Sequence, residues 1–233
     1  MINRLTNWFL TLLVLPALLG AAPATQPASQ PVNRFEKTIL AYEAKDREAP
    51  PPQGAALFIG SSTFTMWKTL AEDMKPIPVI NRGFGGSTIP EVLYYMDRIV
   101  LPYKPAKIIF YTGGNDIAGG ANAEKVFANF KTFVEKARAT LPEVQIYFVS
   151  SKTAPTRVKF AATIDRFNNL VIEHVKQTPG LHFIETRPLL LDAQGAPREE
   201  LFLKDRLHMN RQGYELWIPV IKSAISADAP AKN

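Results

Sequence analysis

Five short apolar segments, separated by longer segments of helical periodicity, limit the fold of this chain more than any other feature of its sequence. The apolar segments lie at residues 56–59, 79–81, 107–111, 145–149 and 181–184. Nearly continuous apolar strands are typical of a parallel sheet that is buried on both faces between helices. The alternation of strand and helix therefore predicts a doubly wound α/β domain with five parallel strands.

Apolar residues recur at helical spacing in the segments that connect and follow these strands. We expect helices at residues 89–99, 123–141, 159–176 and 211–226. Thr88 and Glu91 form a capping-box pattern, which predicts where the first of these helices begins. Asn33 and Glu36 form a similar pattern and predict an N-terminal flanking helix over residues 33–48. The packed face of that helix is expected to hold Phe35, Ile39, Leu40 and Tyr42.

The first residues of the chain have the pattern of an export signal. Arg4 is the only charged side chain before residue 34, residues 8–19 are apolar, and small residues follow at 20–24. The apolar stretch is shorter than the roughly twenty residues that span a bilayer, which favours a cleaved signal over a retained membrane anchor. We expect a signal peptide at residues 1–24, export to the periplasm or the medium, and no stable membrane anchor after cleavage.

The rest of the chain is expected to form a single domain. Residues 25–32 are polar and contain proline, which is typical of a tether. Residues 33–226 then form the domain, and residues 227–233 form a C-terminal tail. With 233 residues, of which 46% are hydrophobic, the chain is long enough for one well-packed core.

Composition excludes several classes of function. The chain has no cysteine, which rules out disulfide scaffolds, iron–sulfur clusters and a cysteine nucleophile. Its three histidines leave little material for a histidine-rich metal site, so we expect neither a metal ion nor a cofactor. The net charge of +6 is spread along the chain without long runs of like charge, so nucleic acid is not an expected partner.

Polar residues gather in four segments, at residues 60–63, 83–88, 113–116 and 205–208. Three of them directly follow predicted strands, and the fourth precedes the last helix. Ligands of open parallel sheets bind at the carboxyl ends of the strands, so the fold is expected to bring these segments to one edge. Each segment alone is typical of an ordinary turn, but together they predict a functional site.

The residue types in these segments favour nucleophilic catalysis by serine. A serine hydroxyl attacks well at neutral pH only when a positioned base takes its proton. His208 is the best candidate base, because Asp205 lies three residues earlier and can orient its ring and stabilise its charged form. His174 and His182 lie within the helix and strand patterns, and we expect them to be structural. A histidine base also predicts that kcat/KM rises with pH through the neutral range.

Attack on a carbonyl group creates an oxyanion, which requires hydrogen-bond donors that are already in place. The candidate donors are the Ser62 N–H, the Gly86 N–H and the side-chain amide of Asn115. The Gly86 N–H precedes the predicted start of a helix, and Ser62 lies at the start of another.

These four segments resemble the motifs of the SGNH (GDSL-type) hydrolases over roughly residues 55–226. Ser62 matches the nucleophile of that family, Gly86 and Asn115 match its oxyanion residues, and Asp205 and His208 match its final block. The resemblance implies a flavodoxin-like three-layer α/β/α sandwich with a five-stranded parallel sheet and metal-independent hydrolysis of esters.

The sequence departs from the family pattern at Ser61, where an aspartate is usual, and Ser61 is the nearest competitor of Ser62 as the nucleophile. Residues 58–62 and the glycine-rich segment are most similar to the branch that includes platelet-activating-factor acetylhydrolase subunits. That branch implies small acyl groups and a shallow, open site. A small-molecule, glycan or lipid ester could be the substrate.

Further side chains in the same loops are candidates to shape the substrate pocket. They are Phe64, Trp67, Arg82, Phe84, Ile117, Arg157 and Met209. Ordinary core packing is the competing interpretation for the aromatic residues. The two arginines are expected either to attract an anionic or sugar-bearing ester or to form ion pairs.

Two other functions fit parts of the sequence. An acyltransferase or deacetylase that acts on a glycan would use the same catalytic triad with a different acceptor or substrate. A non-catalytic flavodoxin-like module could bind FMN through the Ser61-Ser62-Thr63 segment. That second function gives no role to Asp205 and His208.

Overall fold

A computed structural model of the protein describes residues 34–227, which belong to one compact unit. The predicted signal peptide at 1–24, the predicted tether at 25–32, and residues 228–233 of the predicted tail lie outside the described residues. Within the described part of the chain, no helix combines the length and the apolar character needed to cross a membrane.

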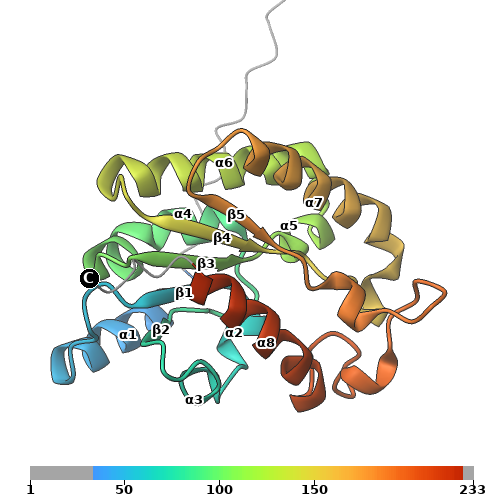
Figure 1. The fold of residues 1–233 in the computed structure, drawn as a ribbon, viewed down its shortest axis with the longest axis horizontal. Helices are drawn as coiled ribbons and strands as arrows, with labels where there is room; N and C mark the ends of the chain where they lie inside the picture. Colours follow the sequence, from blue (N-terminus) through green and yellow to red (C-terminus); the bar gives the residue numbers. More distant parts are fainter. Residues whose placement is uncertain (1–33, 228–233) are drawn as a thin grey trace, which may run out of the picture. The chain divides into compact units, whose positions relative to one another are not determined.

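The centre of the fold is a parallel sheet of five strands (Figure 1), in the order β2-β1-β3-β4-β5. The strands are β1 (Ala56–Gly60), β2 (Val79–Asn81), β3 (Lys107–Tyr111), β4 (Gln145–Val149) and β5 (Leu181–Ile184). This confirms the predicted five-stranded parallel sheet. The chain leaves β1 toward β2 on one side and continues with β3 on the other, so the loops after β1 and β3 meet at the switch point of the topology.

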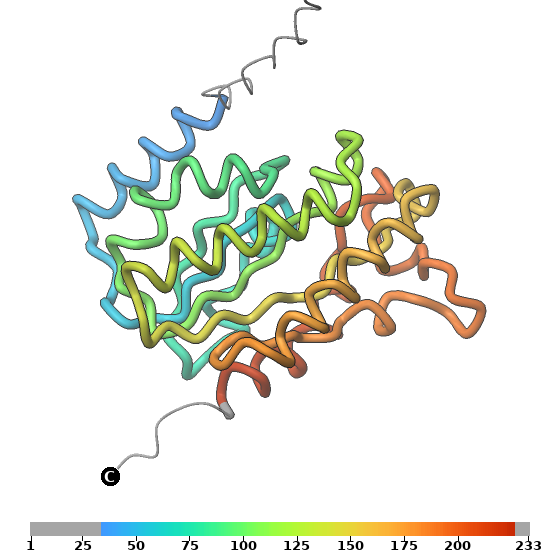
Figure 2. The backbone as a smooth tube through the Cα atoms, turned by 90° about the horizontal axis from the view of Figure 1, so that it is seen from above, coloured from blue at the N-terminus to red at the C-terminus, as the bar shows by residue number. Residues whose placement is uncertain are grey.

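Helices cover both faces of the sheet. One face is covered by α1 (Glu36–Glu48), α4 (Ile89–Ile99), α6 (Ala123–Thr140) and α7 (Ala161–Lys176), which lie side by side in Figure 2. The other face is covered by α2 (Ser62–Thr65), α3 (Leu70–Asp73) and α8 (Arg211–Ala227). Short helices complete the chain: α5 (Gly114–Ala118), η1 (Leu101–Tyr103), η2 (Pro155–Phe160), η3 (Arg187–Leu190) and η4 (Glu199–Leu201).

Two hydrophobic cores hold these layers together, because successive strand residues point to opposite faces of the sheet. In β1, Leu57 and Ile59 face the core under α4 and α6, whereas Phe58 faces the core under α8. Each of these three side chains is fully buried. The result is the three-layer α/β/α sandwich that the sequence predicts.

The structure confirms one predicted helix start and corrects another. Thr88 and Glu91 form the expected capping box at α4. The flanking helix α1 instead begins at Glu36 without a side-chain cap, and the Glu36 carboxylate binds Arg98 on α4 at 2.9 Å. Asn33 lies outside the described residues. Leu40 is 49% exposed because it lies next to buried Ile39 in sequence and is therefore rotated about 100° around the helix.

The predicted helix at residues 159–176 also begins later than expected. Its first two residues belong to the 3₁₀ helix η2, and α7 begins at Ala161.

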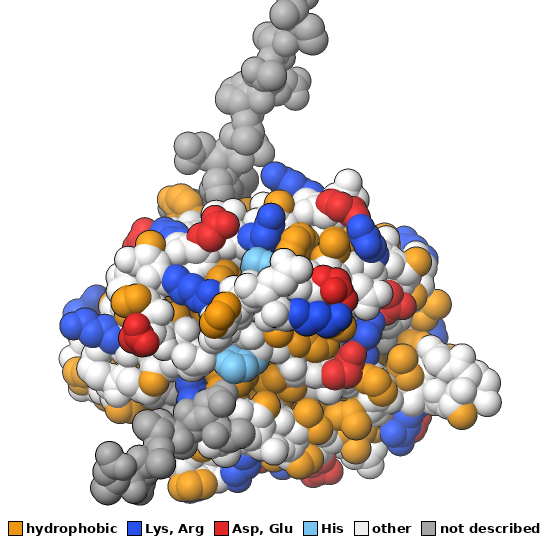
Figure 3. Space-filling model, turned by 45° about the horizontal axis from the view of Figure 1, so that its top comes forward, with side chains coloured by type: hydrophobic (Ala, Val, Ile, Leu, Met, Phe, Trp, Pro, Cys, Tyr) orange, Lys and Arg blue, Asp and Glu red, His pale blue; other side chains and the backbone are white. Residues whose placement is uncertain are grey.

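Over the face shown in Figure 3, basic and acidic side chains are interspersed. Exposed ion pairs of the protein include Lys136–Asp97 and Arg166–Glu124.

Candidate active site

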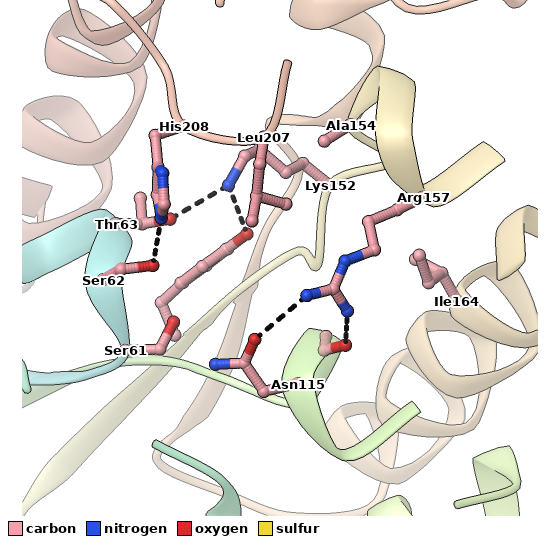
Figure 4. A pocket seen from close by; sticks show the side chains of 12 residues that line it. Ser61, Ser62, Thr63, Asn115, Lys152, Ala154, Arg157, Ile164, Leu207 and His208 are labelled. Atoms are coloured by element: carbon pink, nitrogen blue, oxygen red, sulfur yellow. Dashed lines mark hydrogen bonds between the residues drawn. The ribbon is translucent and has the colours of Figure 1, made fainter. Parts of the chain in front are cut away.

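A cavity of about 40 Å³ lies at the carboxyl ends of the strands, where loops from distant parts of the sequence meet (Figure 4). The loop after β1 supplies Ser61, Ser62 and Thr63, and the segment after β3 supplies Gly114 and Asn115. The segment after β4 supplies Lys152, Ala154 and Arg157, while Leu207 and His208 come from the loop before α8. Tyr111 and Ile164 also line the cavity.

Ser62, His208 and Asp205 form a continuous hydrogen-bonded chain. The Ser62 Oγ lies 2.9 Å from His208 Nε2, and His208 Nδ1 lies 2.6 Å from Asp205 Oδ2. The other Asp205 oxygen accepts hydrogen bonds from the backbone N–H groups of Leu207 and His208, at 3.0 Å each. The structure therefore brings together the three residues that the sequence analysis assigned to one site.

The surroundings of Asp205 keep its carboxylate charged. The hydrogen bond with the His208 side chain, helped by the backbone N–H groups of His208 and Leu207, lowers the pKa of Asp205 to about 2. A charged Asp205 favours the tautomer of the imidazole that carries its proton on Nδ1. Nε2 is then free to accept the proton of the Ser62 hydroxyl.

Gly60 determines how the loop after β1 presents Ser62. Its φ is +153°, and a Cβ at this position would lie 1.8 Å from the carbonyl oxygen of Tyr111. The same carbonyl accepts a hydrogen bond from Ser61 N–H at 3.1 Å. Only glycine allows this close approach of the loop to β3. Ser61 is buried beside Ser62, and its hydroxyl does not take part in the hydrogen-bonded chain.

The candidate oxyanion donors lie around the loop that follows β2. Asn115 Nδ2 donates to the Ser87 carbonyl oxygen at 3.0 Å, which leaves its second N–H unused by that bond. A Cβ on Gly85 would lie 3.8 Å from Ser62 Cβ, so this loop passes directly beside Ser62. Among residues 34–227, neither the Gly86 N–H nor the Ser62 N–H has a hydrogen-bond acceptor, although Gly86 does not line the cavity.

A family comparison identifies the protein class. The model of the GDSL-like lipase/acylhydrolase family matches residues 54–216, which include every segment of this site. The chain belongs to the GDSL-like lipase/acylhydrolase family. It is therefore a hydrolase that acts on esters, and the resemblance inferred from the four sequence segments is confirmed. No curated protein sequence matches the chain.

Solved structures share the fold of this GDSL-like hydrolase. A Bacteroides fragilis protein described as an acylhydrolase has 22% identity and a TM-score of 0.69, over 87% of this chain and 99% of its own. A Streptococcus pneumonia protein described as a platelet activating factor has 19% identity and a TM-score of 0.73, over 83% and 94%. An acetyl xylan esterase has 18% identity and a TM-score of 0.59, over 73% and 99%. At these identities the likeness concerns the fold alone.

Most of the side chains expected to shape the substrate pocket of this GDSL-like hydrolase do not line the cavity. Five of them are at most 2% exposed and pack inside the two cores: Phe64, Trp67, Phe84, Ile117 and Met209. They follow the strands in sequence, but their side chains turn inward between the layers. Arg157 does line the cavity.

Arg82 is also absent from the cavity lining, because its guanidinium group joins α1 to the rest of the fold. The guanidinium forms an ion pair with Asp46 of α1, and its Nε donates to the Tyr103 hydroxyl at 2.9 Å. Its side chain is flanked by the rings of Tyr42 and Tyr103. Of the two alternatives expected for Arg82, the structure therefore supports ion pairing and not a place in the substrate pocket.

Lys152 and Tyr111 also line the cavity, although neither is among the candidate site residues from the sequence. A signal for Lys152 was present, because the polar residues 150–153 directly follow the fourth predicted strand. The same rule that selected the other three segments applies to this one. Among residues 34–227, the cavity included, no group of three or more histidine or carboxylate side chains is arranged to hold a metal ion.

Asp116, next to Asn115, makes the free energy of unfolding of the protein depend on pH. Burial raises the pKa of the Asp116 carboxyl to about 7, although the Ile89 N–H donates to it at 3.1 Å. The folded protein therefore binds this proton more tightly than the unfolded chain, whose aspartates have a pKa of about 4. The protonated Asp116 carboxyl therefore stabilises the folded protein fully below about pH 4, and this stabilisation is lost as the pH rises to about 7.

We expect Asp116→Asn to remove this pH dependence. At about 1.4 kcal/mol for each pKa unit, the free energy of unfolding of the natural protein should fall by roughly 3–4 kcal/mol between pH 4 and 7.5 from this group. Urea unfolding at both pH values measures the fall in the natural protein and in the variant. An equal fall in both proteins would show that Asp116 does not titrate as described.

Proposed function

We propose that this protein is an exported serine esterase that removes short acyl groups from carboxylic esters by a Ser62-His208-Asp205 triad. The observation that carries the proposal is the hydrogen-bonded chain from Asp205 through His208 to Ser62 at one end of the cavity. The scheme draws its nucleophile, base and oxyanion donors from the chain itself and needs no metal ion or cofactor. Export rests on the sequence pattern of residues 1–24.

The first half of the reaction forms an acyl-enzyme. His208 Nε2 takes the proton of the Ser62 hydroxyl while Oγ attacks the carbonyl carbon of the ester. Asp205 stabilises the imidazolium that results. The negative charge on the former carbonyl oxygen is met by Ser62 N–H, Gly86 N–H and the Asn115 amide, and such donors contribute several kcal/mol to barrier lowering. His208 then gives its proton to the departing alcohol oxygen as the C–O bond breaks.

The second half regenerates the enzyme with water. His208 takes a proton from a water molecule, whose oxygen attacks the acyl carbon of the Ser62 ester. The second tetrahedral intermediate is stabilised by the same donors. It collapses by breaking the bond between the acyl carbon and Ser62 Oγ, which recovers the proton from His208. The carboxylic acid leaves the site.

The size of the cavity supports a short acyl group. A volume of about 10–15 Å³ in the same measure holds one water molecule, so 40 Å³ accommodates only a few substrate atoms. The fully buried Phe64 ring packs against the ring of Tyr111, which lines the cavity, with 5.8 Å between the ring centroids. A long acyl chain would have to extend along the surface.

A series of 4-nitrophenyl esters from acetate to dodecanoate tests the proposed function. We expect kcat/KM to be highest for acetate or butyrate and to fall at least tenfold by octanoate. Ser62→Ala supplies the background rate for each ester. An enzyme that prefers dodecanoate would contradict the short-acyl proposal, and an absence of Ser62-dependent hydrolysis with every ester would contradict the esterase.

A further inference from the structure

Lys152 is a buried ammonium group without an acidic partner in the wall of the catalytic cavity. Lys152 is only 9% exposed, and its Nζ donates to Thr63 Oγ1 at 3.0 Å and to the Tyr111 hydroxyl at 3.2 Å. The Tyr111 ring also lies 5.2 Å from Nζ. Among the residues that the structure describes, no carboxylate forms a salt bridge with Lys152.

This environment is unusual for a lysine. Lysine is almost never buried unless it is paired, because removing an ammonium group from water without a counter-charge is costly. Two hydroxyl groups and an aromatic ring compensate only part of that cost. The ammonium has three N–H donors, and the bonds to Thr63 and Tyr111 use two of them. One donor and the full positive charge remain for a group in the cavity.

Arg157 adds a second cation to the same cavity, again without an acidic partner among residues 34–227. Its two terminal nitrogens donate to the Gly114 carbonyl at 2.8 Å and to Asn115 Oδ1 at 3.4 Å. These bonds orient the guanidinium and leave three of its five donors unused. In Figure 4, Arg157 extends into the cavity from the side opposite Ser62 and His208, and Lys152 reaches across to Thr63, the neighbour of Ser62.

Three other buried or half-buried arginines of this protein have the carboxylate partner that Lys152 and Arg157 lack. Arg82 pairs with Asp46, Arg98 with Glu43, and Arg187 with Glu185. These three arginines, which lie outside the catalytic cavity, are each paired with a carboxylate. Inside the cavity the fold places two cations within one small space and leaves both without a carboxylate.

We propose that Lys152 and Arg157 bind a carboxylate group carried by the substrate, close to its ester bond. This inference rests on the proposed esterase function and names the substrate class: an anionic ester, with its carboxylate in either the acyl or the alcohol part. The planar guanidinium suits a carboxylate with two parallel hydrogen bonds, and the lysine adds a point charge. Both cations line the same small cavity as Ser62, so binding the carboxylate there holds the ester carbonyl near the nucleophile.

Matched pairs of esters test the inference on the natural protein. The alcohol part is tested with 3-acetoxybenzoate against the neutral 3-acetoxybenzamide, and the acyl part with monoethyl succinate against the neutral ethyl succinamate. We expect the anionic member of at least one pair to have a kcat/KM at least tenfold higher, mainly through a lower KM. Equal values in both pairs, or a preference for the neutral members, would overturn the inference.

Variants assign the preference to the two cations. Lys152→Met and Arg157→Gln are expected to lower the ratio of kcat/KM between the anionic and neutral esters at least tenfold each. Lys159→Met removes the same charge from an exposed site two residues beyond Arg157 and should leave the ratio unchanged. An equal loss with both esters would mean that Lys152 only supports the site, which contradicts the inference.

The outcomes separate this inference from the esterase itself. Ser62-dependent hydrolysis of the neutral esters without any preference for anionic ones would refute the carboxylate site and leave the esterase standing. Hydrolysis that persists in Ser62→Ala would refute the esterase. If a Lys152 variant does not fold, as judged by circular dichroism, the ester pairs on the natural protein still decide the question.

Discussion

Replacing Ser62 with alanine is expected to lower kcat/KM for an acetate ester by at least about 10⁴-fold. Ser62 Oγ lies 2.9 Å from His208 Nε2 and is the only hydroxyl that forms a hydrogen bond with this histidine in the described part of the chain. Without it no acyl-enzyme can form, and only the oxyanion donors and substrate binding contribute to catalysis. Initial rates with 4-nitrophenyl acetate, corrected for spontaneous hydrolysis, measure the loss.

Ser61→Ala is the matched control for that experiment. Ser61 precedes Ser62 and also borders the cavity, but its hydroxyl is outside the hydrogen-bonded chain. We expect this variant to keep kcat/KM within about tenfold of the natural protein. The assignment of the nucleophile would be wrong if Ser61→Ala lost more activity than Ser62→Ala.

Asp205→Asn is expected to lower kcat by roughly 10³- to 10⁴-fold. The natural carboxylate is ionised throughout an assay from pH 5 to 9, because its pKa is lowered to about 2. An amide has the same shape but cannot stabilise the imidazolium that forms when His208 takes the proton of Ser62. It can also donate to Nδ1 and thereby favour the wrong tautomer of the ring. Steady-state kinetics over that pH range measures the effect.

Asp192→Asn provides the control for the removal of a carboxylate. Asp192 does not line the cavity and accepts hydrogen bonds from its own turn, from the backbone N–H groups of Gln194 and Ala196. Its replacement removes the same charge and should change kcat less than about twofold. A loss below tenfold in Asp205→Asn would mean that solvent replaces the carboxylate, which is 48% exposed.

The strands could be predicted closely because burial on both faces leaves a simple pattern in the sequence. Ile108, Ile109 and Phe110 are all fully buried, so the apolar run coincides with the strand. The start of α1 could not be predicted in the same way. Glu36 fits a capping box, but tertiary contact with Arg98 uses its carboxylate instead. Sequence pattern does not reveal that competition.

The catalytic residues and the residues that line the cavity differ in how far the sequence reveals them. Asp205 and His208 are separated by two residues, and one tight loop brings them together, with Arg206 in the left-handed region at a φ of +55°. Phe64 and Trp67 follow Ser62 in sequence, yet the direction of their side chains depends on packing under α8. Lys152 becomes meaningful only once the structure shows that it lacks an acidic partner.

Covalent labelling of the nucleophile tests the central claim most directly. The natural protein is treated with a fluorophosphonate, digested with trypsin and analysed by fragment mass spectrometry, since Ser61 and Ser62 lie in one tryptic peptide, residues 48–68. We predict a single adduct on Ser62, which persists in Ser61→Ala and disappears in Ser62→Ala. An adduct on Ser61, or labelling that survives in Ser62→Ala, would contradict the mechanism.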